Sequence, residues 1–198
     1  MIVIATPTRA DISIDTTADI IRACKRQPEM LQFLGLKGIY IATLRQAAVM
    51  AARAIDATHV LFVDSDMRFP ADAPERLLGH GQDIVAANYV QRTMPEWWCS
   101  RVGGQPLSSY HRTGLQPVDS TGCGLMLVKL SVFDDCPLPW FDTPFEGVSH
   151  IGEDLYFCRK VRGRGYQILI DHDLSQQVRH QGVVEHGVQA METEGVTV

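Results

Sequence analysis

His59-Val60-Leu61-Phe62-Val63-Asp64-Ser65-Asp66 is the stretch that decides the fold expected of this 198-residue chain. It begins with a continuous apolar run rather than an alternating one, which is typical of a central strand covered on both faces. An amphipathic helix is predicted directly before it, over residues 43–56, where apolar residues recur every three or four positions and Thr43 with Gln46 forms a capping box. A helix that leads into a buried strand predicts an α/β domain with a mostly parallel central sheet flanked by helices.

The rest of the chain alternates between short apolar strands and helices in the same way. Further strands are predicted at residues 2–5, 84–89, 124–128 and 166–170. Further helices are predicted from an N-cap at Thr16 or Thr17 to residue 27, from a capping box of Asp72 and Glu75 to Gly79 or Gly81, at 130–135, and at 153–162. Residues 91–121 are expected to form loops with an edge hairpin, and residues 137–149 a loop. We expect one domain at 1–186, followed by a polar tail at 187–198 that frays.

The composition excludes several classes of protein. Hydrophobic residues make up 45% and charged residues 21%, both near globular averages, and no apolar run reaches the about 18 residues of a membrane-spanning helix. The N-terminus lacks the basic leader of a signal peptide, so we expect no membrane span and a cytoplasmic location. A net charge of -5 argues against nucleic acid as a partner. The five cysteines contain no Cys-x-x-Cys pair and are expected to be reduced thiols.

Asp64 and Asp66 are the strongest candidates for a functional site. Carboxylates at positions i and i+2 of an extended segment point to the same side, and these two stand where a buried strand ends. In open α/β sheets that edge is where ligands bind. Paired carboxylates there suit Mg²⁺ or Mn²⁺ shared with the phosphates of a substrate. The alternative is that both residues only end the strand and cap the next turn.

Glu153 and Asp154 form the second candidate site, at the start of a predicted helix. Acids in the first helical turn interact favourably with the helix dipole, so one interpretation is that both serve stability alone. The functional interpretation is that the dipole lowers the pKa and keeps a carboxylate ionised, as a general base must be. His180, beyond the last strand, is a candidate metal ligand, with His172 and His186 weaker candidates for that role. A lone histidine is more often structural.

Taken together and in this order, these pieces resemble a GT-A-fold glycosyltransferase, close to family 2. The resemblance runs from the first strand to His180. The pieces that carry it are Thr43-Leu44-Arg45-Gln46-Ala47-Ala48, Leu61-Phe62-Val63-Asp64-Ser65-Asp66-Met67, Ser120-Thr121-Gly122-Cys123-Gly124-Leu125-Met126-Leu127-Val128, Gly152-Glu153-Asp154-Leu155 and His180-Gln181-Gly182. The resemblance implies a single Rossmann-like GT-A domain.

The resemblance also implies the roles of individual residues. Asp64 and Asp66 would bind Mn²⁺ or Mg²⁺ at the donor diphosphate, with His180 as a further ligand, and Asp154 would be the catalytic base, with Glu153 beside it. The residues implied in binding the donor are Thr6, Pro7, Thr8, Arg9, Arg45, Asp64, Ser65, Asp66, Gly122, Cys123 and Gly124, and Arg92 is a further candidate for the diphosphate.

The function expected from the sequence is therefore a metal-dependent glycosyltransferase. It would move a sugar from a UDP- or GDP-sugar to the hydroxyl of an unidentified acceptor, by an inverting single displacement. The alternatives are a nucleotidyltransferase of similar fold and a non-catalytic module that binds a nucleotide sugar or glycan. Trp97, Trp98, Tyr110 and Trp140 are predicted either to form a platform for sugar faces or to pack the loops.

Overall fold

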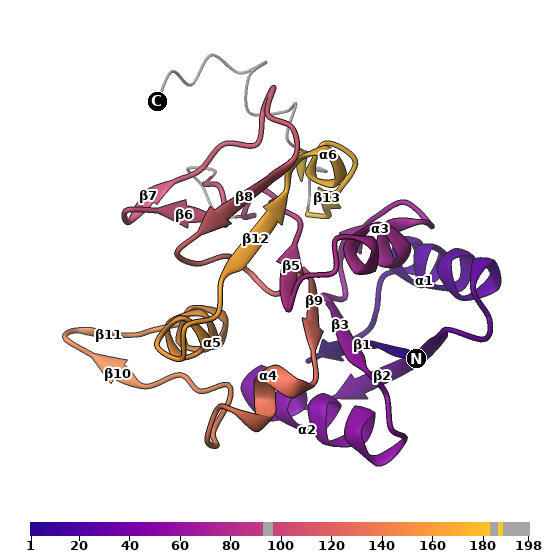
Figure 1. Ribbon diagram of the computed structural model, residues 1–198, viewed down its shortest axis with the longest axis horizontal. Helices are drawn as coiled ribbons and strands as arrows, with labels where there is room; N and C mark the ends of the chain where they lie inside the picture. Colours follow the sequence, from indigo (N-terminus) through magenta and orange to yellow (C-terminus); the bar gives the residue numbers. More distant parts are fainter. Residues whose placement is uncertain (93–96, 183–185, 188–198) are drawn as a thin grey trace.

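A seven-stranded sheet forms the centre of the computed structural model, which describes residues 1–92, 97–182 and 186–187 (Figure 1). The strand order is β2-β1-β3-β9-β5-β12-β8. Five of these strands run in one direction, while β8 and β9 run opposite to their neighbours. The strands are β1 (Ile2–Thr8), β2 (Leu31–Lys37), β3 (His59–Val63), β5 (Ile84–Ala86), β8 (Leu115–Val118), β9 (Leu125–Lys129) and β12 (Ile168–Asp171). The predicted α/β fold with a mostly parallel sheet is confirmed.

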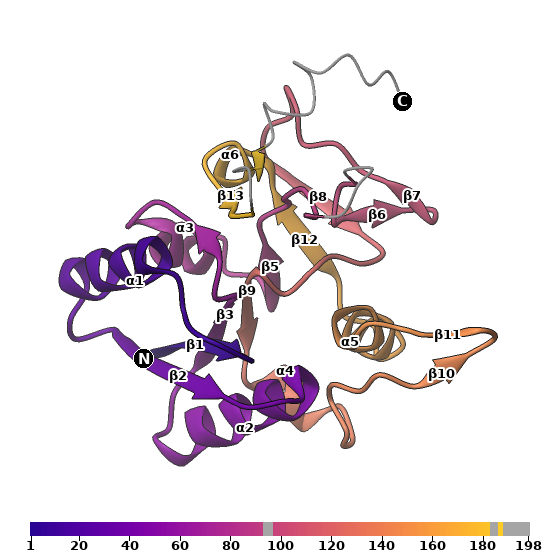
Figure 2. The same ribbon diagram turned by 180° about the vertical axis from the view of Figure 1, so that it is seen from behind.

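Helices cover both faces of this sheet, as Figures 1 and 2 show. One face carries α1 (Ile14–Arg26), α3 (Ala73–Gly79) and α6 (His172–Ser175), and the other carries α2 (Ile41–Ala54), α4 (Ser131–Asp134) and α5 (Glu153–Arg162). Along β3, Val60 and Phe62 join the core under α2 and α5, whereas Leu61 and Val63 join the core under α1 and α3. The run of apolar residues in β3 is continuous because both faces of the strand are buried.

Two predicted helix starts are wrong, and α3 starts after Asp72 as predicted but without the predicted capping bond. α1 begins with Ser13 as N-cap, whose hydroxyl accepts from the Thr16 amide at 3.0 Å. α2 begins at Ile41 without a side-chain cap, and Gln46 instead accepts a hydrogen bond from the Trp140 amide at 3.1 Å. The Asp72 side chain makes no capping bond either, and its expected partner Glu75 binds Arg26 and Gln27 on α1. The predicted capping boxes are thus replaced by contacts between elements.

The edges of the fold also differ from the expectation. The sequence analysis missed β2, although Leu31, Phe33, Leu34 and Leu36 make it apolar; it is an edge strand in which only Leu31 is buried. Residues 91–121 contain a hairpin of β6 (Arg101–Val102) and β7 (Gln105–Pro106), but it forms a separate two-stranded sheet, and the strand that these residues place at an edge of the central sheet is β8. A second hairpin, β10 (Phe145–Glu146) and β11 (Ser149–His150), occupies the end of the segment expected to be a loop. It projects from the body beside α5 in both ribbon views.

A short ribbon outside the main sheet does most to position the site. β4 (Met67–Arg68) pairs with β13 (Arg179–His180), which in turn pairs with β14 (His186–Gly187). Met67 lies opposite His180, so the ribbon brings His180 to the residue that follows Asp66. No helix in the described part of the chain is long and apolar enough to cross a membrane. The predicted polar tail lies, except for Gly187, outside the described residues.

Candidate active site

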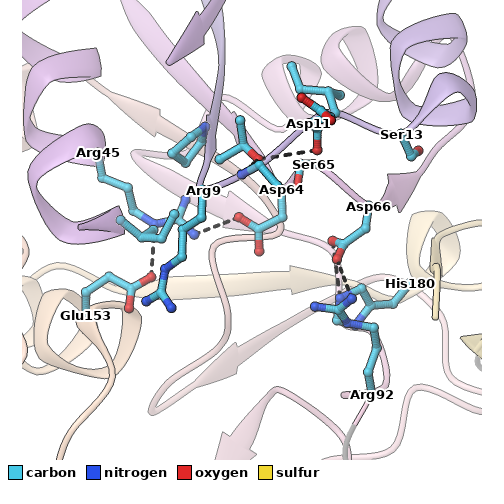
Figure 3. Close-up of a pocket in the computed structure, with 15 residues that line it drawn as sticks. Arg9, Asp11, Ser13, Arg45, Asp64, Ser65, Asp66, Arg92, Glu153 and His180 are labelled. Carbon is cyan, nitrogen blue, oxygen red and sulfur yellow. Dashed lines mark hydrogen bonds and ion pairs between the residues drawn. The ribbon is translucent and has the colours of Figure 1, made fainter. Parts of the chain in front are cut away.

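A cavity of about 630 Å³ lies at the carboxyl ends of β1 and β3. It is the edge at which the sequence analysis placed the ligand site. Figure 3 shows side chains from the β1–α1 loop, α2, the end of β3, α5 and β13 converging on it. Of the predicted site residues, it is lined by Pro7, Thr8, Arg9, Arg45, Asp64, Ser65, Asp66, Arg92, Glu153 and His180.

Arg45 on α2 organises the half of the cavity next to Asp64. Its Nη2 lies 2.7 Å from Asp64 Oδ1 and its Nε lies 3.3 Å from Glu153 Oε1, while only 3% of its side chain is exposed. Burial alone would lower the pKa of Arg45, but the nearby Asp64 and Glu153 carboxylates hold it above its ordinary value. The guanidinium is therefore a fixed positive charge that joins β3 to α5. Its buried Nη1 has no hydrogen-bond partner among the described residues.

Asp66 has different partners. Its Oδ1 lies 3.4 Å from His180 Nε2, and its Oδ2 lies 2.9 Å from Nη1 of Arg92. Burial would raise the pKa of Asp66, but hydrogen bonding and charge from His180, together with the charge of Arg92, hold it below its ordinary value. Asp66 is therefore an ionised carboxylate facing the cavity.

The position of one proton on His180 follows from its second hydrogen bond. Nδ1 lies 3.0 Å from the Val90 carbonyl, which only accepts, so Nδ1 carries a proton. Nε2 faces Asp66 Oδ1 at 3.4 Å: with a proton it is the donor that lowers the pKa of Asp66, and without one its lone pair and the carboxylate oxygen suit a shared cation. Tyr89 packs edge-on against the His180 ring, with the centroids 5.3 Å apart. The ring is thus held in this orientation by contacts on two sides.

Gln181 and Ser13 hold the segment around Asp66 in place through hydrogen bonds. The sequence analysis did not identify either as a site residue. The Gln181 amide donates to the Asp66 carbonyl at 2.8 Å, and its side chain binds the Ser13 hydroxyl and the Asp15 carboxylate. The Ser13 amide donates to the Ser65 carbonyl at 2.8 Å. The β1–α1 loop, the Asp64–Asp66 segment and β13 are therefore connected by hydrogen bonds. Ser13 also caps α1 through Thr16, but its bonds to Ser65 and Gln181 join distant parts of the sequence and leave no local pattern.

The chain resembles known proteins at the level of fold. No protein-family model and no curated protein sequence matches the chain. Among solved structures, A197 from STIV superposes with a TM-score of 0.66 at 17% identity, over 91% of this chain and 85% of A197. The chain has a GT-A-like fold.

S. aureus TarS 1–349, solved alone and in complex with UDP-GlcNAc, matches 87% of this chain with TM-scores of 0.46 and 0.47. Sequence identities are 17% and 16%, and the matched region covers 58% and 56% of the TarS chains. The GT-A-like domain described here thus spans little more than half the length of TarS 1–349.

Within the GT-A-like fold, Asp154 lies near the 122–124 turn rather than on the lining of the cavity. A Cβ atom on Gly122 would lie 3.6 Å from Asp154 Oδ2. Burial, followed by the charge of Glu153, raises the pKa of Asp154 to about 6. The expectation that the helix dipole lowers this pKa is wrong, because both effects outweigh the dipole. A carboxylate with a pKa near 6 is a better proton acceptor than an ordinary aspartate and is still ionised at neutral pH.

The Gly122–Gly124 turn has a structural reason for its small residues. A Cβ on either glycine would collide with the Tyr89 hydroxyl, which accepts a hydrogen bond from the Gly124 amide at 2.9 Å. The glycines therefore make room for Tyr89, whereas the family resemblance implied them in binding the donor. The Cys123 thiol is buried and lies 3.8 Å from the Met126 sulfur, so its side chain belongs to the core.

The first-strand residues fall into two groups. Thr6 is fully buried and does not line the cavity, and its hydroxyl has no hydrogen-bond partner among the described residues. Pro7, Thr8 and Arg9 line the cavity. Figure 3 shows the Arg9 side chain between Glu153 and Asp64. Arg9 is exposed and forms no ion pair within the described residues, so its charge is available to a ligand.

Two members of the predicted aromatic platform are core residues. Trp98 and Trp140 are 4% and 3% exposed, and the Trp140 indole donates to the Phe133 and Cys136 carbonyls. Packing, the alternative interpretation, holds for both. His172, a weaker metal candidate, is buried and hydrogen-bonded to Ser109 and Gln116, away from the cavity. The side chain of His186 lies outside what the structure describes.

Proposed function

We propose that this chain is a glycosyltransferase that moves a sugar from a nucleotide-diphosphate-sugar donor to an acceptor hydroxyl with the help of Mn²⁺ or Mg²⁺. The observation that carries the proposal is the pair Asp66 and His180, facing each other across 3.4 Å at the cavity of a GT-A-like fold. The likeness of fold does not fix chemistry, so the proposal depends on this site. The UDP- or GDP-sugar donor is expected from the family resemblance.

The residues present fit a divalent cation held partly by substrate. Among the described residues, no cluster of three or more His, Cys, Asp or Glu side chains is arranged to hold a metal alone. Asp66 and His180 offer one carboxylate oxygen and one imidazole lone pair, and diphosphate oxygens with water would complete the coordination, as is usual for Mg²⁺. When bound, the cation supplies charge stabilisation for the departing nucleoside diphosphate. Asp64, the third predicted ligand, has its Oδ1 on Arg45.

The chain's own residues do the remaining work. Arg9, Arg45 and Arg92 line the cavity and place positive charge around a diphosphate. Asp154 accepts the proton of the acceptor hydroxyl as that oxygen attacks the anomeric carbon. Glu153 raises the pKa of Asp154 through its charge and is itself held by Arg45. One attack from the side opposite the leaving group gives inversion, which is the outcome we propose.

A donor panel tests the proposal. The purified protein is incubated with UDP-, GDP- and dTDP-sugars, with and without Mn²⁺, and free nucleotide and sugar products are measured. We expect metal-dependent release of nucleoside diphosphate from one donor class. Release of pyrophosphate from a nucleoside triphosphate would instead identify a nucleotidyltransferase. If no donor is bound, hydrolysed or used with metal present, the proposal is wrong.

Asp154→Asn separates an enzyme from a binding module. The amide keeps the shape of the side chain but is not a base, so transfer should fall about 100- to 10,000-fold while donor affinity stays the same. Donor affinity is measured by calorimetry and transfer by product formation. A module that only binds would show no transfer in either form.

A further inference from the structure

A second cavity, of about 480 Å³, lies against the other side of the β4–β13 ribbon. Arg68 on β4 pairs in register with Arg179 on β13, directly beside the Met67–His180 pair. Successive side chains of a strand point to opposite faces, so Arg68 and Arg179 lie on the face opposite His180. Both arginines line this second cavity, together with Arg22 and Gln177. One ribbon therefore separates two polar cavities.

The second cavity carries more positive charge than its carboxylates neutralise. Asp19 is its one acidic lining residue, with 4% of its side chain exposed. Asp19 already accepts hydrogen bonds from Arg68 Nε at 2.7 Å, from the Phe69 amide at 3.2 Å and from Arg22. Arg68 also lies 3.5 Å from Asp15. The three arginines that line the cavity, Arg22, Arg68 and Arg179, are opposed by only these two aspartates, so one positive charge is left without a counter-charge.

Arg179 carries that charge. It is half-buried and has no ion-pair partner in the described part of the chain. Arg22, on the facing helix α1, is 53% exposed, so its guanidinium is accessible from the cavity. Two guanidinium groups on facing elements, with an exposed glutamine amide nearby, match the oxygens of a phosphate, which arginine binds in a bidentate manner.

We propose that this second cavity is a binding site for the phosphate group of a small phosphorylated ligand. Phe69, Pro70 and Ala71 form the apolar part of its wall and would contact the part of the ligand that bears the phosphate. The proposal does not depend on the activity of the first cavity. It assigns a role to Arg179 that the glycosyltransferase chemistry leaves unexplained.

Nuclear magnetic resonance of arginine side chains tests the site with inorganic phosphate as probe. The protein is saturated with UDP and Mn²⁺, and phosphate is added to about 10 mM, a range suited to weak sites. We expect saturable shifts of the Arg22 and Arg179 Nε–H signals. Arg179→Gln should weaken phosphate binding about tenfold, since a hydrogen bond to a charged group is lost.

Two variants act as controls. Arg26→Gln removes a charge from the same helix but outside the cavity and should leave phosphate binding unchanged. Arg9→Gln removes a charge from the first cavity and should also leave the Arg179 shift unchanged. Absence of saturation, or equal phosphate affinity in the wild type and Arg179→Gln, would overturn the proposal. Because the readout is binding, its failure would leave the proposed transfer activity untouched.

Discussion

Asp64 and Asp66 stand two residues apart, yet their surroundings differ sharply. Asp64 is bound to Arg45, whose side chain is 3% exposed and also holds Glu153. Asp66 is bound to Arg92, which is 52% exposed, and faces His180. A buried arginine with two partners is part of the architecture, whereas an exposed one is easily displaced. Two identical side chains in one motif therefore divide into a carboxylate held by a buried arginine and one with an exposed partner, which is the carboxylate that we propose binds the cation.

The largest expected effect on stability comes from removing Arg45, the shared partner of Asp64 and Glu153. Arg45→Met leaves Asp64 and Glu153 without their shared counter-charge, so the free energy of unfolding should fall by about 3 kcal/mol. Arg92→Met, the matched change in the other half, should cost less than about 1 kcal/mol because its ion pair is exposed. Urea denaturation measures both. Equal losses would show that the two halves are not different.

Changes at Asp66, which we propose binds the cation, should alter the affinity for Mn²⁺ more than changes at Asp64. Asp66→Asn should weaken Mn²⁺ binding about 100-fold or more, since even outer partners of metal ligands contribute 10- to 100-fold. Asp64→Asn should weaken it much less, because that carboxylate is engaged by Arg45. Titration calorimetry with Mn²⁺ alone measures both affinities. A loss at Asp64→Asn as large as at Asp66→Asn would make Asp64 the third ligand that the sequence predicts.

Asp154 is bound to neither Arg45 nor Arg92. The pH dependence of transfer tests whether Glu153 raises the pKa of Asp154. Its pKa of about 6 means that the base is protonated below that pH, so transfer should fall about tenfold per pH unit there and level off above it. Glu153→Gln removes a charge that raises this pKa and should move the midpoint to lower pH. An unchanged midpoint would contradict the assignment of Asp154 as the base.

The raised pKa of Asp154, which makes it a better base, also makes the folded protein less stable as the pH rises. The folded-state pKa of Asp154 lies above its ordinary value of 3.8, so the fold favours the protonated form, and this contribution is lost as pH rises towards about 6. Asp154→Asn should therefore raise Tm at pH 7.5 relative to the wild type, with little difference at pH 4. A lower Tm at pH 7.5 would show that the ionised carboxylate stabilises the fold.

The smallest effect is expected at Arg92. Arg92→Gln removes a positive charge 2.9 Å from Asp66, so Mn²⁺ should bind about 2- to 5-fold more tightly, in line with the strength of an exposed ion pair. Calorimetry in the absence of nucleotide measures this without the contribution of Arg92 to a diphosphate. Weaker Mn²⁺ binding in this variant would mean that Arg92 supports the cation site and does not compete with it.

The sequence predicted what depends on local pattern. The apolar run of β3 and the acids after it identified the sheet edge, and most lining residues followed from that edge and from the family resemblance. The sequence did not reveal the bond between Ser13 and Gln181, which joins residues 168 positions apart. Nor did it reveal Gln46 as the partner of the Trp140 amide. Such contacts arise from packing between distant elements and leave no periodicity in the chain.

The β4–β13 ribbon has a consequence for how the protein is made. β13 follows every strand of the seven-stranded sheet in the chain, so a ribosome completes the sheet before it synthesises His180. The sheet needs no residue of β13, whereas Asp66 gains its partner His180 only when β13 pairs with β4. We expect the ability to bind a cation to depend on this pairing and not on the sheet alone.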